Sequence, residues 1–228
     1  MKRFVFSLVA VVALCIGFTQ FAQARLIVEV VDLNDLTADI FSDLDYGIAG
    51  ATVTGTEGLV IFDSTQSANL GNYWTGSGFL AAANYPIPEP GLLGNASFNL
   101  NALATGENVL ISILADEFQV PAGPPINFTS TVNASTLNAA EYSFEVDVNG
   151  MELLSAIDVA DTSTYQANEL LNVAAPFEII HTFTLNALAV GADLGIDMST
   201  EASVPTPGPL ALLGLGLVGM VSARKFMS

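Results

Sequence analysis

Positive charge is almost missing from this sequence. No Lys or Arg occurs in residues 26–203. The five basic residues all lie near the two ends, at Lys2, Arg3, Arg25, Arg224 and Lys225. The segment 25–203 therefore sets one cation against 23 carboxylates, a formal charge of −22. Such a segment cannot neutralise phosphates, so nucleic acid is excluded as a partner, and acidic substrates and anionic membrane surfaces are repelled.

Catalytic side chains are scarce as well. The only cysteine, Cys15, lies in a segment that we expect to be removed, which excludes disulfides, thiol catalysis and cysteine-based metal sites. The only histidine, His181, lies in an alternating pattern without a Ser-centred elbow motif, and we interpret it as an ordinary strand residue. Carboxylate pairs such as Asp43 with Asp45 are material for glycoside hydrolysis, but making loops and sheet faces soluble is their simpler role. We therefore predict that the protein is not an enzyme.

The first 24 residues have the three parts of a secretory signal peptide. Lys2 and Arg3 form a basic start, residues 4–18 are apolar, and Ala22 and Ala24 supply a small-x-small cleavage site. An uncleaved membrane anchor is the alternative, but the apolar stretch is short for a membrane span. We expect a signal helix that is cleaved after Ala24, with residues 25–203 leaving the cytoplasm.

Residues 25–203 show the pattern of many short strands. Runs rich in β-branched residues occur at 26–31, 51–55 and 58–63, separated by Gly, Asn and Asp. Proline-rich loops at 84–91 and 120–128 interrupt any long helix. This pattern predicts one all-β domain, an antiparallel β-sandwich of jelly-roll-like type. Residues 32–47 fit helical spacing as well as loop packing.

The clearest hairpin is centred on Asn149 and Gly150, which supply the two positive-φ positions of a type I′ turn. This loop predicts that Val148 faces Met151, Asp147 faces Glu152, and Val146 faces Leu153. A second pattern is an internal echo, because residues 98–108 and 183–193 share Phe, Leu-Asn-Ala-Leu-Ala and Gly in register. Two equivalent hairpins would explain the echo, and so would chance reuse of a good local solution.

Two kinds of ligand suit an acidic, cysteine-free body. Ca²⁺ prefers oxygen ligands, which are concentrated at Asp32, Asn34, Asp35, Asp43 and Asp45, although without the EF-hand pattern. We expect no resident cofactor, with Ca²⁺ at these five residues as the alternative. A sugar is the second ligand, because Tyr73 and Trp74 in a glycine-rich loop are able to stack on it, although partial core is the simpler interpretation of this pair.

The C-terminal residues 204–228 form a separate unit. Gly214, Gly216 and Gly219 match the spacing of a dinucleotide-binding loop, but only nine residues follow, so this interpretation fails. We predict a proline-rich stalk at 204–208, a short transmembrane helix at 209–223, and a basic end at 224–228. The 18 residues from Pro209 to Phe226 span roughly 27 Å as a helix, and Arg224 and Lys225 would stay on the cytoplasmic side.

Residues 204–225 resemble the PEP-CTERM sorting signal that exosortases recognise in Gram-negative bacteria. The motif is carried by Val204, Pro205, Thr206, Pro207 and Gly208, with Thr in the place of the usual Glu. The apolar block LALLGLGLVG and then Arg224 and Lys225 follow it. The resemblance implies export by the Sec machinery, transient residence in the inner membrane with the body in the periplasm, processing by an exosortase near Pro205–Pro207, and delivery to the cell surface or the extracellular matrix.

The sequence therefore predicts an exported protein of the cell surface or extracellular matrix, with a non-catalytic structural or adhesive role in exopolysaccharide or biofilm. Its expected partners are the exosortase, the Sec machinery and an extracellular polysaccharide. The alternative is a secreted carbohydrate-binding module or weak glycosidase that uses Tyr73, Trp74 and a carboxylate pair, with Ca²⁺ as a possible further requirement.

Overall fold

The structure is a computed structural model, and it describes residues 25–45, 47–53, 58–81, 91–118, 125–174 and 176–203. The strands are β1 (Leu26–Asp32), β2 (Ala38–Ser42), β3 (Ala51–Val53), β4 (Leu59–Asp63), β5 (Trp74–Ala81), β6 (Gly91–Ala102), β7 (Gly106–Phe118), β8 (Ile126–Leu137), β9 (Ala140–Val148), β10 (Met151–Val159), β11 (Ser163–Leu171), β12 (Phe177–Ala187) and β13 (Asp193–Ser203). One short helix, α2 (Ala68–Gly71), precedes β5. The predicted signal helix, stalk and transmembrane helix lie outside the described residues. Within the described ranges, no helix is long and apolar enough to cross a membrane.

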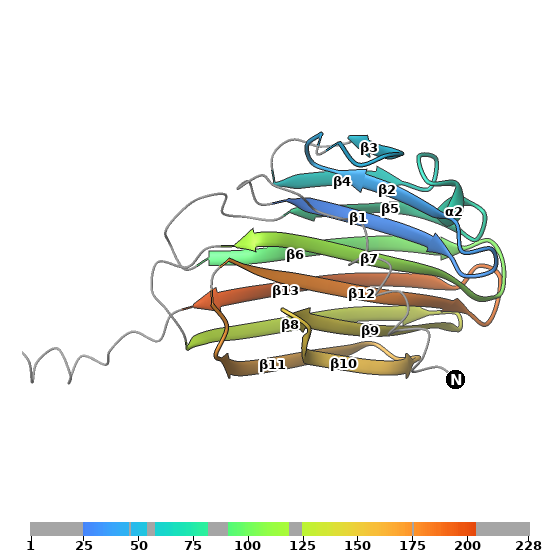
Figure 1. The fold of residues 1–228 in the computed structure, drawn as a ribbon. Helices are drawn as coiled ribbons and strands as arrows, with labels where there is room; N and C mark the ends of the chain where they lie inside the picture. The colour runs from blue at the N-terminus through green and yellow to red at the C-terminus, as the bar shows by residue number, and fades with distance from the viewer. Residues whose placement is uncertain are drawn as a thin grey trace, which may run out of the picture.

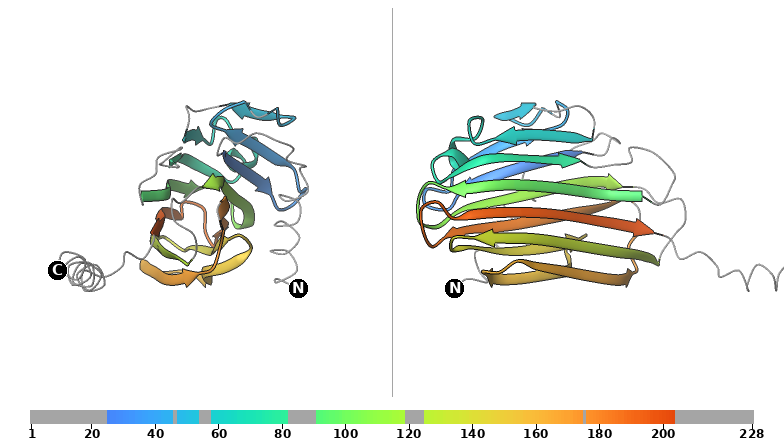
Figure 2. Two further views of the ribbon diagram at one scale, coloured as in Figure 1. Left: turned by 60° about the vertical axis from the view of Figure 1, so that its left-hand side comes forward. Right: turned by 180° about the vertical axis from the view of Figure 1, so that it is seen from behind.

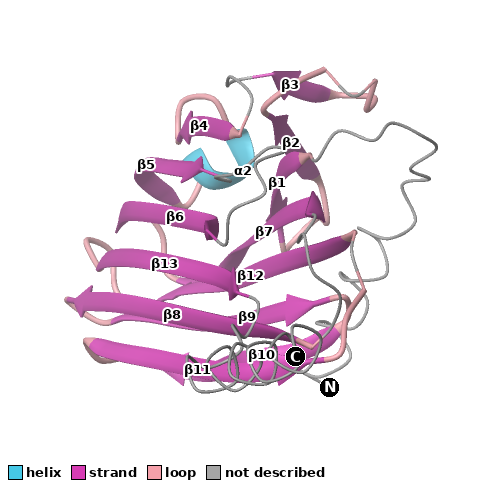
Figure 3. Ribbon diagram, turned by 90° about the vertical axis from the view of Figure 1, so that its left-hand side faces the viewer, coloured by secondary structure: helices cyan, strands magenta, loops and turns pink. Residues whose placement is uncertain are grey.

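The strands form two stacked sheets (Figure 1). The seven-stranded sheet has the order β10-β9-β12-β7-β1-β2-β3, and the six-stranded sheet has the order β11-β8-β13-β6-β5-β4. Figure 3 shows the two sheets end on, facing each other across the core. Among the described residues only β2 and β3 pair in parallel, so the predicted antiparallel sandwich is confirmed.

The core fills the space between the sheets with alternate residues of each strand. Strand β8 shows the alternation clearly, because buried and more exposed residues follow one another along its whole length. Phenylalanine rings connect the two sheets. The ring of Phe41 in the seven-stranded sheet stacks on that of Phe62 in the six-stranded sheet, with centroids 5.2 Å apart. Such aromatic pairs contribute about 0.5–1.5 kcal/mol beyond the burial of their area.

The predicted hairpin between β9 and β10 is confirmed at its turn. Asn149 and Gly150 have φ values of 50° and 74°, and Met151 and Glu152 face Val148 and Asp147 as expected. The third expected pair is wrong, because the register shifts and places Leu154 opposite Val146. Leu153 is buried at this bulge, so the shift keeps an apolar side chain in the core.

The internal echo is not a pair of hairpins. Residues 98–108 lead from β6 in the six-stranded sheet to β7 in the other sheet, and residues 183–193 lead from β12 to β13 in the opposite direction. Each copy is therefore an arch between the sheets. The two arches are neighbours, because Ala102 donates its N–H to Ala192 at 2.8 Å. The equivalent residues Phe98 and Phe183 also meet in the core, with ring centroids 5.9 Å apart.

The segment for which helical spacing was an alternative forms, over its described residues 32–45, a turn and strand β2 and no helix. Asp32 accepts the N–H of Leu36 through its carbonyl and the N–H of Asn34 through its side chain, which closes the turn between β1 and β2. Leu36 has a φ of 60°, a conformation that ends helical propagation.

The two ends of the sandwich differ. Strand β1 begins and strand β13 ends at the left end in Figure 1, so Arg25 and Ser203 share that end. The arches at 103–105 and 188–192 and the turn at 138–139 lie at the other end, together with α2 (Figures 1 and 2). The end with Arg25 and Ser203 is the terminal end, and the end with the two arches and α2 is the arch end.

Candidate functional site

Short polar side chains cover the outer face of four neighbouring strands of the six-stranded sheet, β8, β13, β6 and β5. On β8 the outward positions are Asn127, Thr129, Thr131, Asn133 and Ser135. The neighbouring strands contribute Ser97, Asn99 and Asn101 from β6 and Thr75 and Ser77 from β5. Strand β13, between β8 and β6, contributes Asp193, Asp197, Ser199 and Glu201. Each amide and hydroxyl is both a donor and an acceptor of hydrogen bonds.

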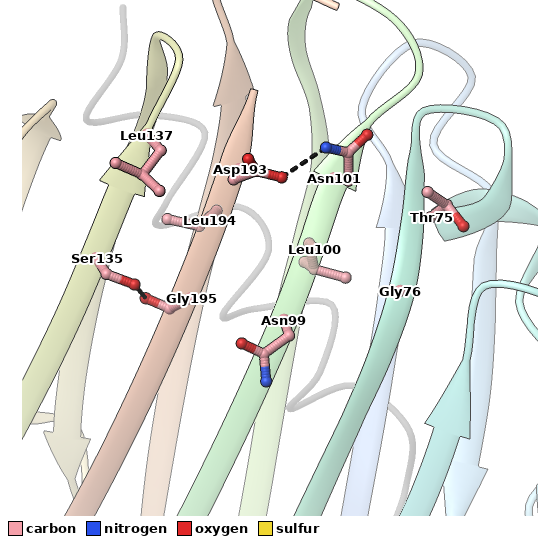
Figure 4. Close-up of a pocket in the computed structure, with 10 residues that line it drawn as sticks. All are labelled: Thr75, Gly76, Asn99, Leu100, Asn101, Ser135, Leu137, Asp193, Leu194 and Gly195. Carbon is pink, nitrogen blue, oxygen red and sulfur yellow. Dashed lines mark hydrogen bonds between the residues drawn. The ribbon is translucent and has the colours of Figure 1, made fainter. Parts of the chain in front are cut away.

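At the arch end, this face is hollowed into an open groove of about 490 Å³. Strand pairing sets its floor and walls in two rows that cross the sheet. One row contains Ser135, Gly195, Asn99 and Ser77, and the next contains Leu137, Asp193, Asn101 and Thr75. Figure 4 shows the side chains of Ser135, Asn99, Asn101 and Asp193 on the open side of the sheet. Leu100 and Leu194 also line the groove, but their side chains are buried.

The groove exists because two of its lining residues are glycines, which have no side chain to fill it. A Cβ atom on Gly195 would lie 2.7 Å from Ser135 Oγ and 3.4 Å from Asn99 Oδ1, so any side chain there would occupy the space between these two residues. Gly76 allows β5 to approach β6 closely, because a Cβ on it would lie 2.0 Å from the Asn99 carbonyl oxygen, and its φ of 147° favours glycine.

Asp193 is the charged group of the groove, and two amides hold it. Asn101 donates from Nδ2 to Asp193 Oδ1 at 2.5 Å, and Asn138 donates from Nδ2 to Asp193 Oδ2 at 3.4 Å. The side chains of Asn99 and Thr75 have no such partner among the hydrogen bonds of the described residues, so they are available to a ligand. The groove therefore offers a fixed carboxylate and several neutral donors and acceptors.

An apolar rim borders the groove at the arch end. Leu137 lines the groove itself and is 63% exposed. Leu103, Leu188 and Val190 in the adjacent arches are also exposed. Backbone hydrogen bonds hold these segments together, from Gly191 N to Ala102 O at 2.8 Å and from Leu188 N to Ala139 O at 2.9 Å. The groove therefore places hydrogen-bonding side chains beside apolar ones, a combination found in sites for small molecules.

The predicted aromatic pair does not form a sugar platform. Trp74 is completely buried and lies in the core, so it cannot stack on a ligand: the sugar-stacking alternative is wrong for Trp74, and the simpler interpretation as core is confirmed. Tyr73 is partly buried, and its hydroxyl donates to Asp32 Oδ2 at 2.8 Å while it accepts from Asn34 Nδ2 at 3.0 Å. The pair instead fixes the start of β5 against the turn that follows β1.

The five predicted calcium ligands have other partners. Asp32 Oδ1 accepts the backbone N–H of Asn34, and Asp35 Oδ1 accepts both the N–H and the hydroxyl of Thr37. Asp43 is fully buried and accepts backbone N–H groups of Leu26, Leu44 and Gly58. Asp45 accepts the N–H of Gly47. No group of three or more Asp, Glu, His or Cys in the described ranges is arranged to hold a metal ion. Ca²⁺ at these residues stays a prediction that the geometry does not favour.

His181 lies inside the core, facing the other sheet. It is 3% exposed, and its Nε2 lies 2.9 Å from Thr200 Oγ1, which lies 3.1 Å from Ser130 Oγ. Burial lowers the pKa of His181 to about 4. This short polar chain joins β12 to β13 and β8 across the sandwich. It agrees with the prediction of a strand residue.

A carboxylate cluster occupies the outer face of the other sheet. The confirmed pair of Asp147 and Glu152 lies beside Glu145. Burial, followed by the neighbouring Asp147 and Glu152 carboxylates, raises the pKa of Glu145 to about 7. This outer face therefore carries clustered carboxylates, whereas the outer face of the six-stranded sheet carries mainly Asn, Ser and Thr side chains.

The sorting motif at Val204–Gly208, the glycines and the basic pair of the tail, and the cleavage residues Ala22 and Ala24 all lie outside the described residues. Sequence reasoning missed the groove residues Asn99, Asn101, Ser135, Asp193 and Gly195. A signal for them was present, because Asn, Ser or Thr occupies every second position in both 95–101 and 127–135. The order of the strands, which brings these two segments to either side of β13, has no such signal.

Comparison with known proteins gives only distant likeness. No protein-family model matches the sequence, and no curated protein matches it. Among solved structures, the PA14 sugar-binding domain from an RTX adhesin is 11% identical, over 76% of this chain and 88% of that one, with a TM-score of 0.32. The carbohydrate-binding module TmCBM61 in complex with β-1,4-galactotriose is 13% identical, over 62% of this chain and 98% of that one, with a TM-score of 0.29. These scores are too low to assign a fold family or a ligand.

Proposed function

We propose that this protein is an exported, non-catalytic component of the cell surface or extracellular matrix, and that its groove binds a neutral polysaccharide. The observation that carries the proposal is the groove itself, in which Asn99, Asn101, Ser135 and Asp193 surround a floor of glycine beside exposed leucine. Sugars present hydroxyl groups that both donate and accept hydrogen bonds, and C–H faces that pack on apolar side chains.

Charge selects among polysaccharides. Asp193, Asp197 and Glu201 lie on the outward face of β13, and residues 26–203 contain no cation to offset them. An anionic polymer is repelled by this face, whereas a neutral one forms hydrogen bonds with it at no electrostatic cost. The carboxylate of Asp193 accepts hydrogen bonds from sugar hydroxyls more strongly than a neutral oxygen does.

The groove is tested with the full chain in affinity electrophoresis against soluble glucan, galactan and mannan, with polygalacturonate as the anionic polymer. We expect retardation by at least one neutral polymer and none by polygalacturonate. Gly195→Val places a side chain between Ser135 and Asn99 and is expected to weaken retardation about tenfold or more. Ser199→Val, on the same face of β13 but away from the groove, is the matched control and should bind normally.

Equal binding by both variants, or binding to polygalacturonate alone, would contradict the groove as the site. A melting temperature for each variant separates loss of binding from loss of fold.

The destination forms the second part of the proposal, and it rests on the sequence of residues 204–228. The proline-rich stalk, the apolar stretch and the basic end support export by the Sec machinery, transient anchoring in the inner membrane and release by an exosortase. Removal of residues 209–228 is expected to abolish association with the cell envelope. Unchanged association after this deletion would show that the tail is not a sorting signal.

A further inference from the structure

The first residue after the predicted signal-peptide cleavage site is also the only cation of residues 25–203. Arg25 lies opposite Asp116 at the terminal end of the sandwich, where β1 pairs with β7. Its guanidinium binds the Asp116 carboxylate, with Nη2 2.6 Å from Oδ2 and Nε 3.3 Å from Oδ1. Both side chains are largely buried, so solvent screens this pair only weakly.

The backbone nitrogen of Arg25 binds the same carboxylate. It donates to Asp116 Oδ1 at 2.9 Å, and the carbonyl of Arg25 accepts the N–H of Asp116 at 3.1 Å. In the unprocessed chain this nitrogen is a neutral amide. After cleavage between Ala24 and Arg25, the same atom is an α-ammonium group with a full positive charge.

The surroundings of this nitrogen are acidic. Asp43 lies next to it, because its Oδ1 accepts the N–H of Leu26 at 3.3 Å and its charge raises the pKa of Asp116. Glu178 on β12 also lies near, because burial first and then the charge of Asp116 raise the pKa of Glu178. Burial is the largest cause of the raised pKa of Asp116, and the Arg25 guanidinium offsets it in part. Asp116 therefore has two further carboxylates near it and one guanidinium bound to it, and a second cation at this position would offset more of the negative charge.

We propose that Asp116, with Asp43 and Glu178 around it, is a binding site for the new N-terminal ammonium of Arg25, so that removal of the leader locks the end of β1 to β7. The proposal does not depend on the groove or its ligand. It gives cleavage a structural consequence, because the exported chain acquires an ion pair that its precursor lacks.

The expected pH dependence follows from the sign of the interaction. Ion pairing raises the pKa of an ammonium above its unfolded value of about 8. Its contribution to stability is therefore complete below about pH 8 and is lost as the pH rises through the folded pKa. A guanidinium stays charged throughout this range, and carboxylates ordinarily ionise far below it, so the α-amine is the group at this site whose charge changes near pH 8.

Selective acetylation tests the site. In a chain that has lost residues 1–24 and keeps residues 204–228, the α-amine of Arg25 and the side chain of Lys225 are the only amines, since residues 26–203 contain no lysine. Acetylation is expected to lower the melting temperature of the processed chain by about 2–6 °C at pH 7. In Asp116→Asn the same treatment is expected to change it by less than about 1 °C, and this variant also controls for Lys225. In Arg25→Gln the acetylation effect should persist, because the ammonium remains.

A measurement without variants covers the case in which Asp116→Asn does not fold. The pH dependence of the acetylation rate reports the pKa of the α-amine, which should lie above about 8 in the folded protein and return to about 8 in urea. An equal acetylation effect in the wild type and in Asp116→Asn, an unshifted amine pKa, or a first residue other than Arg25 by N-terminal sequencing would each overturn the proposal.

Discussion

Acidification is expected to destabilise this fold through one buried side chain. His181 is 3% exposed, with Val146 and Ile113 beside it in the neighbouring strands and Thr200 Oγ1 2.9 Å from its Nε2. Burial lowers its pKa from 6.5 to about 4, so the folded protein holds the neutral ring down to a pH at which the unfolded chain is already protonated. A lowered pKa for a base means that stability is complete above about pH 6.5 and is lost as the pH falls towards 4.

The size of the effect follows from the shift. At about 1.36 kcal/mol per pKa unit, a pKa of about 4 in place of 6.5 corresponds to roughly 3 kcal/mol between pH 7 and pH 4. Carboxylates titrate in the same range with the opposite sign, because groups such as Glu145 have a raised pKa and favour the fold when protonated. The contribution of His181 therefore has to be isolated by comparison with a variant.

His181→Gln is the suitable variant, because its amide is able to bond to Thr200 but does not titrate. The free energy of unfolding is measured in urea from pH 7 to pH 4, with the fluorescence of Trp74, the only tryptophan and a fully buried one, as the probe. We expect the wild type to lose about 3 kcal/mol relative to His181→Gln across this range. A difference between the two proteins that stays constant with pH would refute the reasoning.

Two further predictions concern the residues first proposed as calcium ligands. Asp43→Ala removes a buried carboxylate that accepts three backbone N–H groups. It is expected to lower the free energy of unfolding, measured by urea denaturation, by about 3 kcal/mol or more. A loss below about 1 kcal/mol would show that water replaces the carboxylate. Calorimetric titration with Ca²⁺ is expected to give no heat of specific binding, because these carboxylates bond to their own backbone, and a heat with one-to-one stoichiometry would restore the calcium hypothesis.

Local features of the sequence predicted local features of the fold. The turn at Asn149 and Gly150 was correct, because the positive φ values it needs depend on those two residues alone. The register beyond Glu152 was wrong, because the bulge at Leu153 depends on the demand of the core for that side chain. The interpretation of the echo around Phe98 and Phe183 as two hairpins was also wrong. A short turn does not reveal whether the next strand returns to its own sheet or crosses to the other.

The site was less predictable than the fold. Trp74 was considered for a ligand because it lies in a polar, glycine-rich segment, yet the pairing of β5 with β6 turns it into the core. The groove needs β5, β6, β13 and β8 side by side, and this order does not follow the order of the chain. Gly195 illustrates the difficulty, because its importance lies in the missing side chain between Ser135 and Asn99, two residues about sixty and one hundred positions away.

Strand β13 connects the two ends of the molecule. It begins with Asp193 in the groove and finishes at Ser203, immediately before the predicted stalk. Eleven residues at about 3.3 Å each make it a rigid spacer of roughly 35 Å. The groove therefore lies at the end of the sandwich opposite to Ser203, so a tether through the predicted tail would leave the groove at the far end from the point of attachment.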